Sequence, residues 1–469
     1  MINEQETYRP GGIRINSIGL INYNNEAFDL RTFVQGFNVY EDIFTPTMSA
    51  DVTIVDAVGL VERFPIIGDE VFFIDFQTPT FEKNLRLQFD VVKIGNHKKL
   101  GERGDFYTLH CVSREYTKNL SGMVDKAYSG YYISDIVSNV FRDYIKSDLG
   151  DKQLSVENTI GKHAIVAPTT KPFEFINFLA SEARSETYPN DSCYLFYEDH
   201  DQYNFTTIAS LINQEPVESY YDAIQNVDET LGASASSQAI KSIDYLTQFD
   251  VIKQHERGLI DNNALVVDTI FKKSQTFTFL YDDGYDKLNH LGDNKVRPSN
   301  SRFNNNIGES HSRYFVGNLS DGNYYQESYL DKRCTPIDGL AYYPSQRYRF
   351  INNKIATMAA VNNIAIHIDI PGNTDRKAGD VIQLYIPQSS DDSEYRNTYN
   401  KLFGQKGNAK FLVVRVKHSY TTGGEFITSM KVTKDNYSSF PSTELSEVVG
   451  LWVIMIILEW VNLFGSLVL

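Results

Sequence analysis

Short runs in which apolar and polar residues alternate fill the first quarter of the chain, with Gly, Pro and Asn between them. A period of two is typical of strands that bury one face. We therefore predict a β-domain over residues 1–118. One short helix is expected within it, over Ala57–Phe64, because Asp56 is a suitable N-cap and Pro65 disfavours further helix.

The apolar spacing becomes helical in the next stretch. Between residues 133 and 145, apolar residues recur at intervals of three and four, which places them on one helical stripe. Thr170 and Pro172 open a second expected helix, since proline is favoured in the first helical turn. Together with the two strands described next, these helices predict a mixed α/β domain over residues 119–225.

Two short strands are expected at Cys193–Tyr197 and Tyr203–Ile208. The turn that joins them, Glu198 to Gln202, contains three acidic residues. Paired carboxylates are also the catalytic groups of glycosidases, but a charged hairpin tip is far more often solvated. We expect this turn to be exposed.

The β pattern returns later in the chain, and its segments match those of the first domain in the same order. Four pairs of residues mark the match: Phe37 with Phe249, Asp56 with Asp268, Gly68 with Gly379, and Phe89 with Phe411. We interpret this as a second copy of the β-domain, split over residues 226–272 and 342–440 by a loop-rich insertion at 273–341.

The paired residues have structural roles in this interpretation. Phe37 and Phe249 should fill equivalent core positions, and Asp56 and Asp268 should cap equivalent turns. Gly68 and Gly379 should allow matched tight turns into strands. For any single position, a turn or core residue without a role in assembly is an equal alternative.

Residues 441–469 form an apolar tail. Val448–Leu458 is uninterrupted by polar residues, Trp452 and Trp460 are the only tryptophans of the chain, and the polar positions Glu459, Asn462 and Ser466 fall on one helical stripe. A membrane-spanning helix needs about 20 apolar residues, and a carboxylate at its centre is unfavourable. We favour a helix packed in an oligomer or against a partner, with membrane insertion and a non-native terminus as alternatives.

Composition and charge exclude several classes of protein. The net charge of −16 on 469 residues argues against a protein that wraps nucleic acid, although a channel that DNA only traverses is compatible with it. The three cysteines are scattered, and the chain lacks zinc-ligand spacings, phosphate-binding loops and nucleophile motifs. We expect no cofactor, no metal site and no enzymatic activity. The first residues carry no secretory signal pattern.

Three segments resemble one known family. Residues 37–46, continuing through Asp56 to Glu70, resemble the N-terminal signature of the central baseplate hub proteins of contractile-tailed bacteriophages. Relatives of that family include the N-terminal part of VgrG spikes in type VI secretion. Residues 171–180 and 194–198 resemble the middle domain of the family, and Phe411–His418 resembles its closing strands.

The resemblance implies an α+β, mainly β fold, with two tube-type antiparallel β-barrel domains in each chain, a mixed domain, an insertion and a hydrophobic C-terminal helix. It implies a homotrimeric ring with pseudo-six-fold symmetry, because three chains with two like domains present six like units. The implied partners are a trimeric spike protein, a tail tube or tube-initiator protein, baseplate wedge proteins and a tape measure protein. DNA would pass through without specific binding. No spike-type domain follows residue 437, so the spike should be a separate chain.

The implied location is the baseplate of the virion tail, after assembly in the host bacterial cytoplasm. Two other functions remain open at this point: a membrane-active delivery protein that uses the C-terminal helix, and a hydrolase carried on the tail tip. Deleting residues 445–469 would separate packing from membrane insertion, since only the former predicts lost assembly with unchanged liposome binding.

Overall fold

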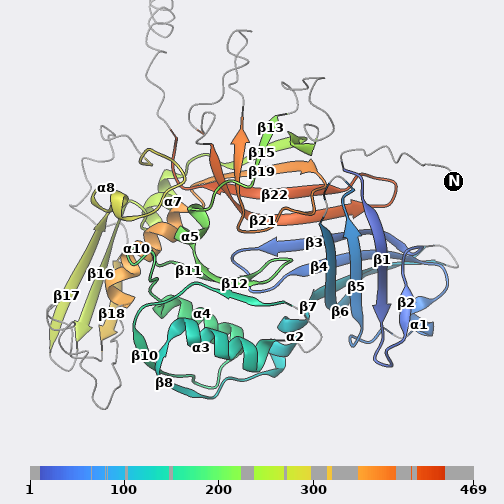
Figure 1. Cartoon of the computed structure of the whole chain (residues 1–469), viewed down its shortest axis with the longest axis horizontal. Helices are drawn as coiled ribbons and strands as arrows, with labels where there is room; N and C mark the ends of the chain where they lie inside the picture. The colour runs from blue at the N-terminus through green and yellow to red at the C-terminus, as the bar shows by residue number, and fades with distance from the viewer. Residues whose placement is uncertain are drawn as a thin grey trace, which may run out of the picture.

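Strands dominate the structure, and the chain is mainly β. The computed structural model describes residues 11–64, 66–79, 81, 83–100, 104–146, 152–222, 237–268, 272–296, 314–319, 347–386, 403 and 409–438. A large sheet crosses the molecule, a compact group of helices and short strands lies below it, and a smaller sheet stands to one side (Figure 1).

The large sheet has 14 strands and joins two groups of strands. The N-terminal strand group contains β1 (Arg14–Ile21), β2 (Ala27–Asp29), β3 (Val34–Asp42), β4 (Ser49–Asp56), β5 (Val71–Gln77), β6 (Asn84–Leu100) and β7 (Gly104–Ser113), with the short helix α1 (Leu60–Arg63). The C-terminal strand group contains β13 (Glu218–Asp222), β14 (Ala239–Ile240), β15 (Ser242–Thr247), β19 (Ile364–Pro371), β20 (Val381–Tyr385), β21 (Lys410–Thr421) and β22 (Ile427–Lys434).

The two strand groups repeat one topology. Hydrogen-bonded neighbours follow the order β3-β4-β7-β6-β5-β1 in the first group and β15-β19-β22-β21-β20-β13 in the second. If each strand is matched with the strand at the same place in the other group, the matched strands also occur in the same sequence along the chain. The first five places share antiparallel pairing. The sixth differs, because β1 is antiparallel to β5 whereas β13 is parallel to β20.

The register aligns the two groups residue by residue. Phe89 lies opposite Phe72 in the first group, and Phe411 lies opposite Ile382 in the second. A register shift follows two residues later in both, between Val91 and Lys93 and between Val413 and Arg415. Phe89 and Phe411 therefore occupy equivalent positions, and both are fully buried.

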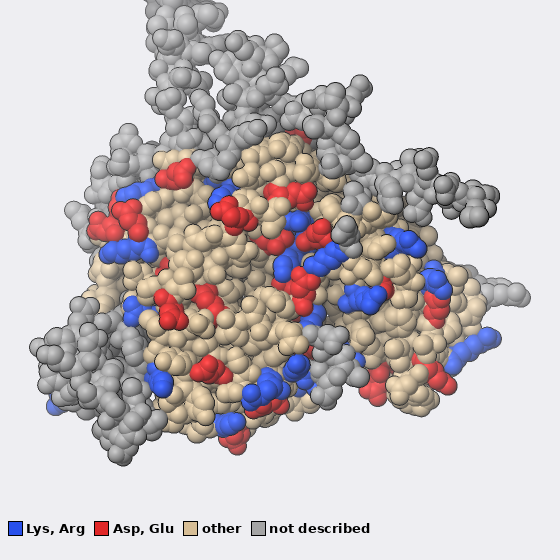
Figure 2. Space-filling model, viewed as in Figure 1, with Lys and Arg blue, Asp and Glu red and all other residues tan. Residues whose placement is uncertain are grey.

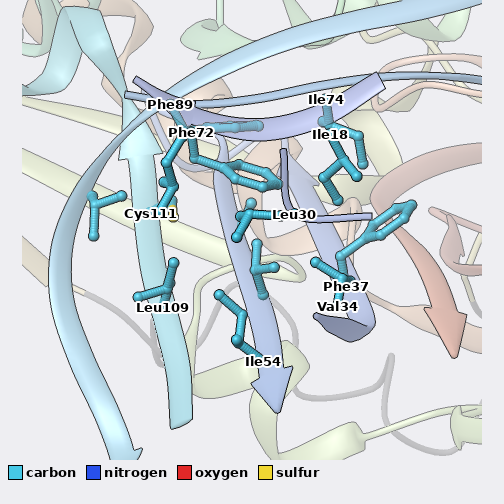
Figure 3. Packing of buried hydrophobic residues seen from close by; sticks show 14 of the residues in the cluster. Ile18, Leu30, Val34, Phe37, Ile54, Phe72, Ile74, Phe89, Leu109 and Cys111 are labelled. Atoms are coloured by element: carbon cyan, nitrogen blue, oxygen red, sulfur yellow. The ribbon is translucent and has the colours of Figure 1, made fainter. Parts of the chain in front are cut away.

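Alternation along the strands builds the core of each group. In β5, every second residue points inward, so Phe72, Ile74 and Phe76 are buried while their neighbours are partly exposed. Figure 3 shows Phe72 beside Phe89, with Cys111 of β7 close by. Burial of a large apolar side chain stabilises by about 1.5–3 kcal/mol, so each group has a core of its own.

Two of the expected residue equivalences are wrong. Phe249 is 66% exposed, whereas Phe37 is buried in β3, and the register makes Ile243 of β15 the counterpart of Phe37. Phe249 precedes the helix α7 (Val251–Glu256), whose N-cap carboxylate, on Asp250, accepts a hydrogen bond from the backbone of Lys253. That cap favours a helix at the place where the sequence similarity suggested a strand.

The second wrong equivalence concerns Asp268. It ends β16 (Asp261–Asp268), which belongs to a separate sheet with β17 (Lys273–Leu280) and β18 (Tyr314–Leu319). By register, the counterpart of Asp56 is Gly372. Residues 251–268 thus do not belong to the second strand group, and β13 shows that this group already begins within the expected mixed domain.

The separate sheet, together with α7, α8 (Tyr281–Gly284), η2 (Tyr285–Lys287) and α10 (Arg347–Ala360), forms an insert between β15 and β19. The expectation of a loop-rich segment with few buried anchors is wrong for its described part. Phe279, Tyr281 and Leu288 are buried and pack with Ala356 and Ala360 of α10.

The middle domain lies between the two strand groups along the chain. Its elements are α2 (Arg114–Ser121), β8 (Ala127–Tyr132), α3 (Ile133–Val140), the π-helix η1 (Phe141–Ile145), β9 (Leu154–Val156), β10 (Lys162–Val166), α4 (Pro172–Glu182), β11 (Tyr194–Glu198), β12 (Tyr203–Thr207) and α5 (Ile208–Ile212). The two helices α3 and α4 pack below the large sheet (Figure 1).

The C-terminal tail, with Trp452, Glu459, Trp460, Asn462 and Ser466, lies outside the described residues. Among the residues that are described, no helix combines the length and the apolar character needed to cross a bilayer.

Candidate assembly surface

The two strand groups meet where β21 pairs with β3. Antiparallel pairing runs from Arg415 opposite Asp42 to Thr421 opposite Gly36. Side chains reinforce it: Arg415 forms an ion pair with Asp42, and the Ser419 hydroxyl donates to the Asn38 side-chain oxygen at 2.8 Å. The junction is therefore a continuous hydrogen-bonded sheet.

Two different strands pair with the same side of β21, one at each end. Its first residues pair with β20, and its second half pairs with β3. The equivalent strand β6 pairs with β5 only over Asn84–Asp90. In the described part of the chain, no strand covers that side of β6 beyond Asp90. We call residues 93–100 the β6 edge.

A second edge lies open at the other end of the repeat. The strand β3 pairs with β4 on one side and with β21 on the other. Its counterpart β15 pairs with β19 on one side, and no described strand lies on the other. We call residues 242–247 the β15 edge. Unpaired edges expose backbone donors and acceptors and are templates for pairing with another chain.

The side chains of the two edges are complementary in charge. The β6 edge exposes Lys93, Lys98 and Lys99, and the β15 edge exposes Asp244. Ser419 and Lys98 are equivalent by their partners, since they lie opposite the equivalent residues Ile427 and Phe106, although β6 has a second register shift, between Gly95 and Lys98, that β21 lacks. Since Asn38 corresponds to Asp244, the contact of Ser419 with Asn38 predicts Lys98 facing Asp244 across an interface of the same geometry.

The sequence-predicted turn residues lie beside this framework. Gly68 and Gly379 both have positive φ, 99° and 95°, shortly before the equivalent strands β5 and β20, but the register makes Ala378 the counterpart of Gly68, so the expected match is off by one residue. Equivalent backbone bonds follow, from Val91 to Glu70 and from Val413 to Asp380. Only Gly379 is also crowded, because a Cβ atom there would lie 2.4 Å from the Tyr197 hydroxyl of the middle domain.

Asp56 fixes the turn that precedes α1. Its carboxylate accepts hydrogen bonds from the backbone of Val58, at 2.9 Å, and of Leu60. The helix begins at Leu60 and ends at Arg63, which is shorter than the sequence predicted.

The acidic turn of the middle domain is buried against the N-terminal strand group, so the expectation that it is solvated is wrong. One oxygen of Glu198 accepts from the Met48 backbone at 2.8 Å and from the Ser113 hydroxyl at 2.6 Å. The other oxygen lies 2.6 Å from the Lys152 ammonium. Asp199 is also buried and pairs with Lys377 of the C-terminal strand group. The turn therefore contacts both groups.

The neighbouring residue of this turn, His200, belongs to a buried polar cluster with Glu41 of β3 and His418 of β21. His200 Nδ1 lies 2.8 Å from a Glu41 carboxylate oxygen. Burial raises the pKa of Glu41, but the electrostatic interaction and hydrogen bond with His200 lower it by more. The pKa of Glu41 therefore lies below its usual value. No motif could reveal this cluster, because its members are more than 150 residues apart in the sequence.

Positive and negative side chains are interspersed on the face shown in Figure 2. A surface that binds nucleic acid concentrates Lys and Arg instead. This face therefore lacks the charge pattern of a nucleic-acid binding site.

Comparison with known proteins connects this architecture to phage tails. No family model matches the sequence. The chain is 21% identical over 408 residues to the probable baseplate hub protein gp334 of Vibrio phage KVP40, covering 81% of this chain and 85% of the relative. The chain is thus similar over most of its length to a probable phage baseplate hub protein.

Two solved structures of tail proteins share the fold of this chain. The tail protein from Neisseria meningitidis MC58 has a TM-score of 0.51 at 8% identity, with 92% of this chain and all of that chain covered. The 43 kDa tail protein of prophage MuSo2 from Shewanella oneidensis has a TM-score of 0.50 at 8% identity, covering 89% and 98%. These relatives are described as tail and baseplate proteins.

Proposed function

We propose that three copies of this chain form a closed ring in the tail baseplate, in which six like strand groups surround one axis. The observation that carries the proposal is the junction between β21 and β3 together with the two open edges. Pairing the β6 edge of one copy with the β15 edge of the next repeats that junction between chains. The result is a sheet that continues from group to group.

The geometry of such a contact favours closure. The two edges are different surfaces of the chain, so the contact is heterologous, and heterologous contacts form rings when the rotation closes. Because the contact between chains repeats the contact within the chain, three chains make six similar junctions. This is the basis of the pseudo-six-fold symmetry.

A ring of this kind joins two symmetries. One face presents six like units to a hexameric tail tube or tube-initiator protein, and the three-fold arrangement suits a trimeric spike on the other. Baseplate wedge proteins and a tape measure protein are further proposed partners. DNA would cross the ring without specific contacts, for which the net charge of −16 is suitable. The proposed location is the virion tail, after assembly in the host bacterial cytoplasm.

A pair of engineered cysteines tests the ring directly. Lys98→Cys and Asp244→Cys place thiols at facing positions of the proposed interface, where Cα atoms about 4.5–5.5 Å apart suit a disulfide. Oxidation of the double variant should yield a covalent trimer that reducing agent converts to monomer. Each single variant should remain monomeric on a denaturing gel.

A matched pair controls for random collision. Met123→Cys, exposed on the middle domain, replaces Lys98→Cys in a second double variant with Asp244→Cys. A ring predicts no defined trimer from this control pair. A covalent dimer as the end product of the Lys98 and Asp244 pair, or no cross-link at all in assembled particles, contradicts the proposal.

A further inference from the structure

The cluster of Glu41, His200 and His418 lies where three parts of the molecule meet. Glu41 comes from β3, His200 from the turn between β11 and β12, and His418 from β21. One ligand atom from each side chain lies within 4.8 Å of the other two. All three side chains are buried, with those of Glu41 and His200 fully inaccessible.

His418 leaves one ring nitrogen without a partner. Its Nδ1 lies 3.2 Å from the Thr428 hydroxyl, and its buried Nε2 has no hydrogen bond. An unsatisfied polar atom in the interior costs about 1–3 kcal/mol. The Thr428 hydroxyl donates to the Asn373 carbonyl oxygen at 3.4 Å, so it can accept a hydrogen bond from Nδ1, and a neutral ring with its proton on Nδ1 has its lone pair on Nε2.

His200 also has its two nitrogens in different surroundings. Nδ1 faces Glu41, and Nε2 lies 2.9 Å from the Lys83 ammonium and 3.7 Å from a carboxylate oxygen of Asp201. Metal-binding histidines often donate their outer nitrogen to a carboxylate, and Asp201 could accept from Nε2 only after Lys83 moves aside and the 3.7 Å separation closes. Lys83 has its own bond to Asp201, at 2.8 Å, so it keeps a partner if the proton of His200 moves to Nε2.

Glu41 completes the set. One of its oxygens accepts from the Ala378 backbone at 3.0 Å, and the other faces His200. Two imidazole nitrogens and one carboxylate oxygen are a ligand set that suits Zn²⁺ and neighbouring divalent transition metals rather than Ca²⁺ or Mg²⁺. Binding an ion would require the three atoms, now within 4.8 Å of one another, to move to about 2.0–2.1 Å from it.

We propose that Glu41, His200 Nδ1 and His418 Nε2 bind one divalent transition metal ion of the Zn²⁺ class. The three protein ligands leave one tetrahedral position for a water molecule. An ion here links the N-terminal strand group, the middle domain and the C-terminal strand group. This proposal is independent of the oligomeric state.

Metal content and metal binding of the full, untagged chain test the site. The chain is dialysed against EDTA, returned to buffer and titrated with Zn²⁺ by calorimetry, with Co²⁺ as a spectroscopic probe. We expect one equivalent of each ion to bind, a visible Co²⁺ absorption of tetrahedral type, and a higher melting temperature with Zn²⁺ than with EDTA.

Substitutions assign the ligands. His418→Gln and Glu41→Gln preserve size and should weaken Zn²⁺ binding at least tenfold, and Thr428→Val should weaken it about tenfold through the orientation of His418. His367→Gln removes a partly exposed histidine of β19 and should leave binding unchanged. Absence of stoichiometric Zn²⁺ binding by the unmodified chain overturns the proposal even if a variant does not fold. Undiminished binding by folded His418→Gln overturns it as well.

Discussion

Phe411 lies in β21 at the position that Phe89 occupies in β6. Each phenylalanine lies opposite the second residue of the preceding strand, and each precedes an equivalent register shift. The chain therefore contains the same five-stranded topology twice, and this equivalence is the basis for treating one junction as a template for another.

Phe89 and Phe411 should contribute similarly to stability. Phe89→Ala and Phe411→Ala each remove a buried ring, and we expect each to reduce the free energy of unfolding by about 3–5 kcal/mol. Phe249→Ala is the matched control, because this side chain is 66% exposed, and its effect should stay within about 0.5 kcal/mol. Denaturant unfolding measures all three. A large effect of Phe249→Ala would show that it fills a core position after all.

The charges on the two edges provide a test of chain association in solution. Lys98→Asp places two carboxylates opposite each other at each contact, and like charges there destabilise pairing by roughly 0.2–1 kcal/mol. We expect a smaller fraction of trimer in Lys98→Asp, and recovery in the double variant Lys98→Asp with Asp244→Lys. Native mass spectrometry at low salt measures the fractions. If adding Asp244→Lys to Lys98→Asp does not restore the trimer, residues 98 and 244 do not face each other across the interface.

The two glycines before β5 and β20 offer a comparison within one chain. Gly68→Ala meets only the strain of positive φ, about 1–2 kcal/mol, because the nearest atom to an added Cβ is 3.9 Å away. Gly379→Ala has the same strain and also displaces Tyr197. We expect Gly379→Ala to lower the melting temperature more than Gly68→Ala. Equal shifts would mean that Tyr197 relaxes without loss.

His418 should make stability depend on pH in the metal-free chain. An unfolded histidine takes up a proton near pH 6.5, but the folded ring does so only near pH 4. Between these values the unfolded state binds more protons, so stability falls as the pH is lowered from 6.5 toward 4. His418→Gln should flatten this dependence, and His367→Gln should not.

The pH window matters because neighbouring groups also titrate. Glu41 has a lowered pKa, so its contribution is lost only as the pH falls below the ordinary range of a glutamate. Unfolding measured in EDTA between pH 5 and 6.5 avoids Glu41, and because burial also lowers the pKa of His163, the difference between the unmodified chain and His418→Gln measures the share of His418. If the free energy of unfolding of folded His418→Gln depends on pH as steeply as that of the unmodified chain, His418 is not the source of the dependence.

The sequence predicted the middle helices and the match of Phe89 with Phe411 because these signals are local. The helical stripe of α3 and the alternation in β6 and β21 are periodic patterns of neighbouring residues, which the sequence alone reveals. The similarity of Phe37 and Phe249 was equally local, but pairing with β19 determines which segment becomes the counterpart of β3. Ile243 has that position, and the cap by Asp250 makes the next segment helical.

The buried polar contacts could not be predicted from the sequence for a different reason. Glu198 meets Met48, and His200 meets Glu41, only after the middle domain has packed on the large sheet. A charged turn has the same local sequence whether it faces water or another domain. Its burial is a property of the tertiary fold and leaves no periodic signal.

The opposite directions of β1 and β13 have an evolutionary consequence. In a ring of six identical subunits, every mutation appears six times, so neighbouring positions cannot diverge. Here the two copies are encoded separately, and each can change without the other. The sixth strand has already done so, since it runs antiparallel in one copy and parallel in the other. The proposed ring of three chains, each with two unlike copies, could therefore present alternating surfaces that six identical subunits cannot.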